Sequence, residues 1–186
     1  MTATTGGPLE VAMRGCVRCP TLAATRTQVV VGQTPPGARL LVVGEAPGAQ
    51  EDLVGEPFVG RSGQLLDRLL AEVGLPRPGV AVLNTVKCRP PGNRVPSKAE
   101  TERCRPWLQA QLVATAPVLV LTLGLSATGW FLGRVTLGAV RGQVHEVDGV
   151  RVLPTYHPAA AMRGGPAGEP MRLLREDLAL AVGLVA

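Results

Sequence analysis

The feature that most constrains the fold is a set of three short apolar runs, each followed at once by a glycine or an asparagine. They cover residues 39–43, 80–83 and 118–123 and are followed by Gly44, Asn84 and Gly124. Apolar runs of this length without polar alternation are typical of parallel strands that are buried on both faces. Helical patterns separate the runs, so the sequence predicts an α/β domain with a mostly parallel sheet.

The segments between these runs carry helix and turn signals. Ser62 is the expected N-cap of a helix that continues through Val73 with its leucines on one face. Residues 97–100 (SKAE) form a capping box that opens a second helix. Pro106 is expected to kink or divide that helix, because proline lacks the backbone N–H. Further expected elements are a short strand over 28–31, a short helix over 126–131, a hairpin around 148–149 and a closing helix over 170–184.

Length and composition favour one domain over residues 1–186, with residues 1–10 loose. Hydrophobic residues make up 46% of the chain and aromatic residues only 3%, so leucine, valine and alanine must build the core. No apolar run reaches the ~18 residues needed to cross a bilayer. The N-terminus also lacks the charged-then-apolar pattern of a signal peptide. We therefore expect a cytoplasmic protein without a membrane partner.

The charge balance favours a polyanionic partner. The formal net charge is +5, and all the basic residues except Lys87 and Lys98 are arginine. Arginine suits bidentate contacts with phosphate. An arginine bias can equally reflect codon usage in a GC-rich genome, so charge alone does not establish nucleic-acid binding.

Four cysteines, Cys16, Cys19, Cys88 and Cys104, point to a metal centre in a reducing compartment. The Cys16-x-x-Cys19 pair places two thiolates on one turn, whereas the other two are isolated in the sequence. A zinc ribbon normally uses two close pairs, and this spacing fits a 4Fe–4S cluster at least as well. Spacing does not separate iron–sulfur from zinc, nor does it exclude that Cys88 and Cys104 are ordinary buried thiols.

Polar or glycine-rich segments follow each predicted strand. They cover residues 44–60, 84–96, 124–127 and 155–165. In open α/β sheets, ligands bind beyond the carboxyl ends of the strands. The sequence therefore predicts that these four segments converge on one binding site.

Five motifs carry a family resemblance. They are CVRCP (16–20), GEAPGAQED (44–52), GEPFVGRSGQLLD (55–67), NTVKCRPPGNRVP (84–96) and TYHPAAAMR (155–163). In this order, and with this cysteine spacing, they resemble the family 4 uracil-DNA glycosylases, the iron–sulfur branch of their superfamily. The resemblance implies a three-layer α/β/α sandwich with a short, mostly parallel central sheet. It also implies an enzyme that flips uracil out of DNA and hydrolyses its N-glycosidic bond, leaving an abasic site.

The resemblance assigns three residues to the uracil. Phe58 matches the aromatic side chain on which the base stacks. Asn84 matches the amide that donates to uracil O4 and accepts from N3–H, a pattern that cytosine does not offer. His157 matches the histidine that donates to uracil O2 as negative charge develops on the leaving base. A core phenylalanine, a turn-capping asparagine and a backbone-bonded histidine are the alternative interpretations, and we expect the other histidine, His145, to be structural or exposed.

The loop after the first strand is expected to supply backbone contacts from Gly44, Glu45 and Ala46. Better-known branches of the superfamily have an aspartate where this chain has Ala46, so the group that positions the attacking water is open among Glu45, Glu51 and Asn93. A carboxylate there could also stabilise an oxocarbenium-like sugar.

By the same resemblance, Met162 is the expected wedge that fills the gap left by the flipped base, and Arg163 a phosphate contact. Four further cations are candidates to line the DNA path: Arg61, Lys87, Arg89 and Arg94. Asp52 and Glu56 are expected to be surface or capping residues.

These implications define a monofunctional glycosylase, since no lysine occupies a motif position suited to a Schiff base. The expected partner is uracil-containing DNA, the expected state a monomer, and the expected cofactor a structural 4Fe–4S cluster, with zinc as the alternative. Two other functions remain open at this point: a non-catalytic iron–sulfur DNA-binding module and a zinc-stabilised nucleotide hydrolase.

Overall fold

The computed structural model describes residues 7–186, and its centre is a five-stranded sheet with the order β2-β1-β3-β5-β4. The strands are β1 (Leu40–Gly44), β2 (Ala81–Asn84), β3 (Leu119–Leu123), β4 (His145–Val147) and β5 (Val150–Thr155). The first three and β5 pair in parallel, and only β4 pairs antiparallel, with β5. The predicted α/β class and the mostly parallel sheet are confirmed.

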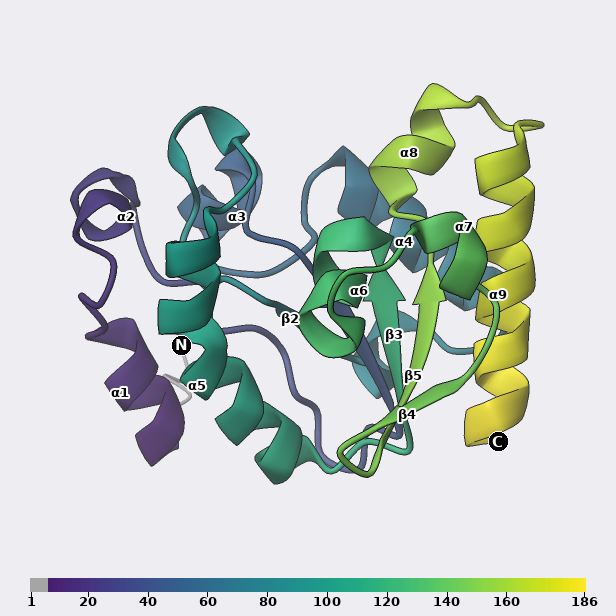
Figure 1. The fold of residues 1–186 in the computed structure, drawn as a ribbon, viewed down its shortest axis with the longest axis horizontal. Helices are drawn as coiled ribbons and strands as arrows, with labels where there is room; N and C mark the ends of the chain where they lie inside the picture. Colours follow the sequence, from purple (N-terminus) through teal and green to yellow (C-terminus); the bar gives the residue numbers. More distant parts are fainter. Residues whose placement is uncertain (1–6) are drawn as a thin grey trace.

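Helices join these strands. In the described residues they are α1 (Pro8–Arg14), α2 (Pro20–Thr25), α3 (Ala49–Val54), α4 (Arg61–Glu72), α5 (Lys98–Thr115), α6 (Gly124–Leu132), α7 (Leu137–Val140), α8 (Pro158–Arg163) and α9 (Glu169–Val185), with 3₁₀ turns at Arg77–Gly79 and Pro91–Asn93. Figure 1 shows α9 along one side of the sheet and α5 on the other.

Two apolar clusters place the helices on opposite faces of the sheet. Leu40, Val42 and Leu121 face one cluster, which contains leucines of α4 and α9. Their neighbours Leu41 and Val43 face the other cluster, which contains Leu108 of α5 and Ala127 of α6. Because successive strand residues point to opposite faces, both faces of the sheet are covered. The expected three-layer α/β/α sandwich is confirmed.

A third cluster lies outside this sandwich. Met13 of α1 and Leu22 of α2 pack there against Val29, Val86 and three of the cysteines. Figure 1 shows α1 and α2 at the edge of the molecule beyond β2, with α1 beside α5. The N-terminal residues therefore build a small separate core around the cysteines.

Three helices differ from the sequence prediction. Residues 1–6 lie outside the described residues, but residues 8–10 are not loose, because α1 begins at Pro8. Gly60, not Ser62, is the N-cap of α4, because the Glu51 carboxylate accepts the Gly60 N–H at 2.8 Å. Pro106 does not divide α5, which is one helix of 18 residues. Both Pro106 and Glu102, whose carbonyl loses its partner, are exposed, so water can replace the missing bond.

Residues 28–31 form no strand. Isolated bonds hold them instead: Val30 N–H donates to the Lys87 carbonyl at 2.8 Å, and the Gln111 amide donates to the Val31 carbonyl at 2.9 Å. The hairpin between β4 and β5 is confirmed, with Asp148 and Gly149 at φ of 50° and 77°. Positive φ at both positions is typical of a type I′ turn.

No helix of residues 7–186 is both long and apolar enough to cross a membrane.

Candidate active site and cysteine centre

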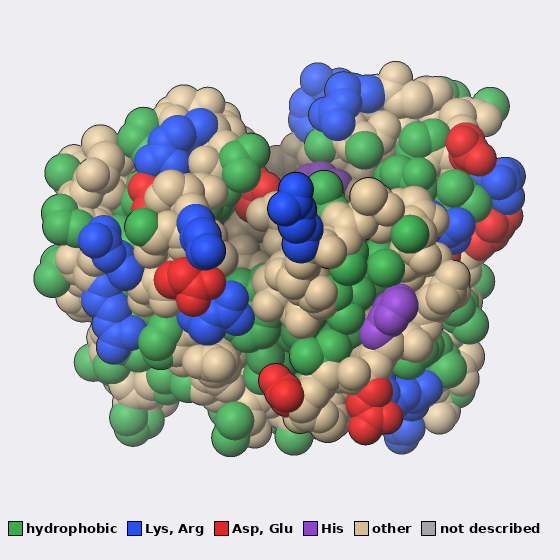
Figure 2. Space-filling view, viewed as in Figure 1, with side chains coloured by type: hydrophobic (Ala, Val, Ile, Leu, Met, Phe, Trp, Pro, Cys, Tyr) green, Lys and Arg blue, Asp and Glu red, His purple; other side chains and the backbone are tan. Residues whose placement is uncertain are grey.

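The four polar segments predicted to converge do so at the carboxyl edge of the sheet. Asn84, Gly44, Leu123 and Thr155 end β2, β1, β3 and β5, which are adjacent and parallel. Their segments therefore leave the sheet at one edge, the upper edge in Figure 1. Figure 2 shows a hollow in the surface there, with Lys or Arg side chains on both of its sides and a histidine set back within it.

Gly44 is the point where two of the expected substrate residues meet. A Cβ added to Gly44 would lie 2.5 Å from the Phe58 ring and 2.6 Å from Asn84 Oδ1. Only glycine therefore allows both side chains to approach the end of β1 so closely. Gly44 and Asn84 are also direct partners in the β1–β2 ladder, so strand pairing fixes their relative position.

Phe58 is held on this floor by unusual backbone geometry. Its φ of 55° is in the left-handed region, which a non-glycine residue adopts only when its surroundings impose it. Arg77 donates to the carbonyls of Pro57 and Phe58 at 2.5 and 3.5 Å. On the other side, Glu51 Oε1 accepts the Val59 N–H at 3.0 Å. Gly63 allows the closest approach, since a Cβ there would lie 1.8 Å from the Phe58 carbonyl oxygen.

His157 lies beside Phe58 in a defined tautomer. The two ring centroids are 5.8 Å apart, and Gly124 lets the histidine pack against the start of α6. His157 Nδ1 accepts the Ala159 N–H at 3.0 Å, so in the neutral ring the proton is on Nε2. Burial, with a smaller contribution from Arg163, lowers the pKa of His157 to about 4. At neutral pH this side chain is thus an uncharged Nε2–H donor.

Asn84 offers an unused acceptor in the same place. The residue is only 3% exposed, and its Oδ1 accepts no hydrogen bond from residues 7–186. A buried polar atom without a partner is costly. An acceptor left open beside an aromatic ring and a neutral imidazole is suited to the N–H of a planar heterocycle.

The three candidates for positioning water have different hydrogen-bond partners in the structure. Both oxygens of Glu51 are engaged with backbone N–H groups of Gly48, Val59 and Gly60, so this carboxylate shapes the loop that carries Phe58. Asn93 is exposed, and its Oδ1 accepts a hydrogen bond from Arg89 at 2.7 Å.

Glu45 directly follows the glycine floor and is half-buried. Its carbonyl accepts the Val86 N–H at 3.0 Å and the Thr85 hydroxyl at 2.7 Å. Ala46 packs toward the cysteine core.

The expected DNA contacts are partly brought together. Arg61 and Met162 line one surface hollow of about 390 Å³, and Arg163 is exposed at the end of α8. Met162 also packs partly against the main core. Lys87 is the exception, because it is 1% exposed and cannot face solvent. Its assignment to a DNA path was wrong.

Asp52 was also misjudged as a surface or capping residue. It is 2% exposed and accepts hydrogen bonds from the backbone N–H groups of Thr27 and Gln28. It therefore ties α3 to the segment that follows α2.

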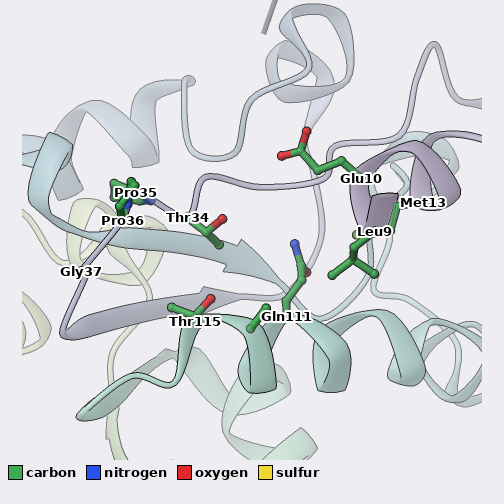
Figure 3. Close-up of a pocket in the computed structure, with 10 residues that line it drawn as sticks. Leu9, Glu10, Met13, Thr34, Pro35, Pro36, Gly37, Gln111 and Thr115 are labelled. Carbon is green, nitrogen blue, oxygen red and sulfur yellow. The ribbon is translucent and has the colours of Figure 1, made fainter. Parts of the chain in front are cut away.

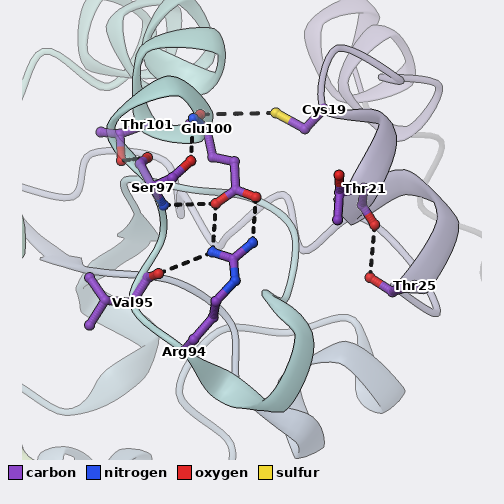
Figure 4. Close-up of polar contacts among 8 residues, drawn as sticks. All are labelled: Cys19, Thr21, Thr25, Arg94, Val95, Ser97, Glu100 and Thr101. Atoms are coloured by element: carbon purple, nitrogen blue, oxygen red, sulfur yellow. Dashed lines mark hydrogen bonds and ion pairs between the residues drawn. The ribbon is translucent and has the colours of Figure 1, made fainter.

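Arg94 forms an ion pair with Glu100 of the same chain. Figure 4 shows its guanidinium donating to both oxygens of Glu100, at 2.8 and 2.7 Å. The Glu100 carboxylate also accepts the Ser97 N–H, and the Glu100 N–H donates to the Ser97 hydroxyl. These two bonds form the predicted capping box of α5. The Arg94 guanidinium holds the pKa of Glu100 at about 2, well below its usual range. A DNA contact by Arg94 stays a prediction.

All four cysteines line one small cavity. Cys16 and Cys19 come from the turn between α1 and α2, Cys88 follows β2, and Cys104 lies in α5. Three sulfurs accept hydrogen bonds: Cys16 from Trp107 Nε1 at 3.2 Å, Cys88 from Arg26 at 3.0 Å and Cys104 from the Lys87 N–H at 3.3 Å. Donors that point at sulfur are the surroundings that metal-bound thiolates require.

Burial keeps the thiols of this cavity protonated when no metal is bound. Burial raises the pKa values of Cys19 and Cys88 and raises that of Cys104 to about 11. These thiols therefore need a metal to become thiolates at neutral pH. Residues 7–186 contain no group of three or more His, Cys, Asp or Glu side chains arranged around a single metal ion. The four sulfurs surround a space and do not meet at one point.

A separate cavity of about 140 Å³ lies at the opposite edge of the sheet. Figure 3 shows it between the residue 34–37 loop, α1 and the end of α5, with Gln111 and Thr115 on its wall. It shares no lining residue with the cysteine cavity. It is thus remote from the site at the carboxyl edge.

Several supporting residues carry no recognisable sequence signal. Arg77 lies in a Pro-Gly turn, yet it clamps the Phe58 loop and pairs with Asp67 at 2.9 Å. Asp177 of α9 accepts the Thr155 hydroxyl at 2.6 Å, two residues before His157. Arg26 and Trp107 reach the cysteines from 62 and 91 residues away. No local pattern could have predicted contacts between such distant positions.

Fold and site together define an α/β sandwich with a polar site at the carboxyl edge of its sheet and a four-cysteine centre beside it. Residues 31–179 match the uracil DNA glycosylase superfamily, and the chain belongs to that superfamily. The match contains Cys88 and Cys104 but begins after Cys16 and Cys19. The resemblance drawn from the motifs is confirmed.

Individual relatives refine this result. A type-4 uracil-DNA glycosylase from Thermotoga maritima is 40% identical over 89% of this chain and 87% of its own length. One from Archaeoglobus fulgidus is 42% identical over 79% of this chain and 78% of its own length. A type-5 uracil-DNA glycosylase from Pyrobaculum aerophilum is 33% identical over 77% of this chain.

Proposed function

We propose that this chain is a DNA repair glycosylase that hydrolyses the N-glycosidic bond of uracil in DNA and leaves an abasic site. The observation that carries the proposal is the meeting of Phe58 and Asn84 over Gly44, with His157 beside them. Superfamily membership and the names of the type-4 relatives support it.

The arrangement can recognise a base only after the base leaves the duplex, because the site lies in a hollow at the sheet edge. Phe58 offers a face for stacking, which is worth ~1–3 kcal/mol per base. The open Oδ1 of Asn84 accepts from uracil N3–H, and the amide NH₂ donates to O4. Cytosine presents an acceptor at N3 and a donor at C4, so the same amide orientation rejects it.

His157 acts on the leaving group. As the bond between C1′ and N1 breaks, its electron pair moves to the base and negative charge spreads to O2. The Nε2–H of the neutral imidazole can donate a hydrogen bond to O2. Donation that strengthens as the charge grows lowers the barrier by electrostatic stabilisation. Met162 fills the space left by the extruded base, and Arg61 and Arg163 contact phosphate.

Water completes the reaction at C1′, and its proton passes to a base or to solvent. Glu45 is the carboxylate we assign to this step and to stabilising the positive sugar, because Glu51 is engaged with backbone N–H groups. Asn93 is the weaker candidate, since its side chain pairs with Arg89.

Cys16, Cys19, Cys88 and Cys104 would hold a 4Fe–4S cluster, which needs four thiolates around a shared space. The cluster supplies structure here, since hydrolysis of the glycosidic bond transfers no electrons. Its effect is to fix the segment that joins Asn84 to Cys88. Uracil-containing DNA is the proposed partner, and we propose that one chain acts as a monomer.

The test uses a single-uracil oligonucleotide, followed by alkali to cleave abasic sites. The wild-type protein should give a cut strand. His157→Ala and Asn84→Ala should reduce the single-turnover rate by about 100-fold or more, as removal of such donors does, while His145→Ala should leave it unchanged. An uncut strand with wild-type protein that still binds the DNA would instead show a non-catalytic iron–sulfur binding module.

A further inference from the structure

Lys87 carries a buried amine that the reaction does not use. It is 1% exposed and is the largest of the fully buried side chains among the described residues. An ammonium group inside a protein is costly unless it meets a strong acceptor. Its Nζ donates to the backbone carbonyl of Asn84 at 2.7 Å.

Among residues 7–186, the Asn84 carbonyl has no neighbouring strand to pair with, because β2 is at the edge of the sheet. Val82 exchanges both of its backbone bonds with Gln33 on the open side of β2. Because bonding direction alternates along a strand, Asn84 points its own backbone groups to this same side, beyond the reach of that bridge. Lys87 Nζ takes the place of the missing neighbour and fixes the last peptide of β2.

The same residue is anchored in the cysteine centre. Its backbone N–H donates to Cys104 Sγ at 3.3 Å, and its carbonyl accepts the Val30 N–H at 2.8 Å. The next residue is Cys88, and Lys87 itself lines the cysteine cavity. One residue thus joins the wall of that cavity to the peptide from which the Asn84 amide projects.

We propose that Lys87 is a positioning residue that ties the cysteine centre to Asn84 and so fixes the amide that reads the base. This inference rests on the proposed function. It predicts that loss of the Lys87 side-chain amine impairs recognition of uracil while the cysteine centre stays intact.

The test variant is Lys87→Met, which keeps an unbranched side chain of similar length and removes the donor. The matched control is Lys98→Met, since Lys98 is the only other lysine and is exposed. Two affinities are compared, that of free uracil as an inhibitor and that of DNA carrying an abasic site. The second does not require Asn84 to hold a base.

Lys87→Met should weaken inhibition by uracil by about 10-fold, the loss expected when one strong hydrogen bond is removed. Affinity for abasic DNA and visible absorbance per chain should stay near wild type, and amide hydrogen exchange at Asn84 and Thr85 should become faster. In an Asn84→Ala background, Lys87→Met should have no further effect on excision, because residues that act as a unit are not additive.

Unchanged inhibition by uracil would overturn the proposal. So would parallel loss of absorbance, abasic-DNA affinity and fold, which would make Lys87 a general structural residue. An additive double variant would show that Lys87 does not act through Asn84. Wild-type protein that excises no uracil would refute the proposed function instead, and hydrogen exchange in Lys87→Met would still report on the tie itself.

Discussion

The lowered pKa of His157 makes a sharp prediction for the dependence of excision on pH. If the neutral ring is the donor, the rate must follow its neutral fraction. With the pKa at about 4, about 97% of the rings are neutral at pH 5.5, whereas an ordinary histidine with a pKa of about 6.5 would be about 9% neutral. We therefore expect the single-turnover rate to change little between pH 7.5 and 5.5, where an unperturbed histidine would lose about 10-fold.

The same group links pH to stability. The folded-state pKa lies below the unfolded value, so unfolding takes up a proton at intermediate pH. The contribution of the buried neutral ring is complete above about pH 6.5 and is lost as pH falls toward about 4. For a shift from 6.5 to about 4, it amounts to about 3 kcal/mol. Urea unfolding of the wild type and of His157→Gln at several pH values should show their stability difference shrink by this amount.

Two controls isolate His157. His145→Gln removes the only other histidine, and it should leave both the rate profile and the pH-dependent stability difference as they are. DNA is kept saturating, so that weaker binding does not mimic a slower reaction. A tenfold fall in rate centred near pH 6.5, present in the wild type and in His145→Gln, would refute the reasoning.

Three further outcomes follow from the geometry. Gly63→Ala should cost about 1–3 kcal/mol of stability by urea unfolding, because its Cβ would lie 1.8 Å from the Phe58 carbonyl; stability equal to wild type would contradict this close approach. Cys88→Ser should abolish visible absorbance and lower the melting temperature by several degrees, whereas His157→Ala should keep its colour, and a coloured Cys88→Ser would exclude Cys88 as a ligand. DNA affinity should fall steeply with salt. Arg163→Gln should flatten the dependence of affinity on salt more than Arg94→Gln, because Arg94 is paired with Glu100. Equal slopes in the two variants would contradict this expectation.

Much of the fold could be predicted because its signals are local. The apolar runs became β1, β2 and β3, the Asp148-Gly149 turn became a hairpin, and the Ser97 capping box opens α5. The convergence of the polar segments also follows from parallel strands alone, since all their carboxyl ends share one edge. These features depend on local residue patterns and on the alternation of strands and helices, both of which can be read from a single sequence.

The features that the sequence did not predict depend on contacts between distant residues. Lys87 is the only lysine in the motif region and was interpreted as a surface cation, but tertiary packing places it inside. The sequence also gave no sign that the chain folds back so that Val59 and Gly60 donate to the Glu51 carboxylate, and a catalytic role for Glu51 stays a prediction. The left-handed backbone of Phe58 depends on Arg77, 19 residues later. No periodicity or turn pattern reports such long-range partners.

The ladder that pairs Gly44 with Asn84 has a consequence for how the protein should respond to heat. In the proposed function, the amide that selects the base ends a strand of the sheet, while the residues proposed for stacking and leaving-group assistance lie in the segments beside it. Warming or mild denaturant should loosen those segments first. The excision rate is then expected to decline at temperatures where the protein still rejects cytosine. Heating should therefore lower activity before it lowers specificity.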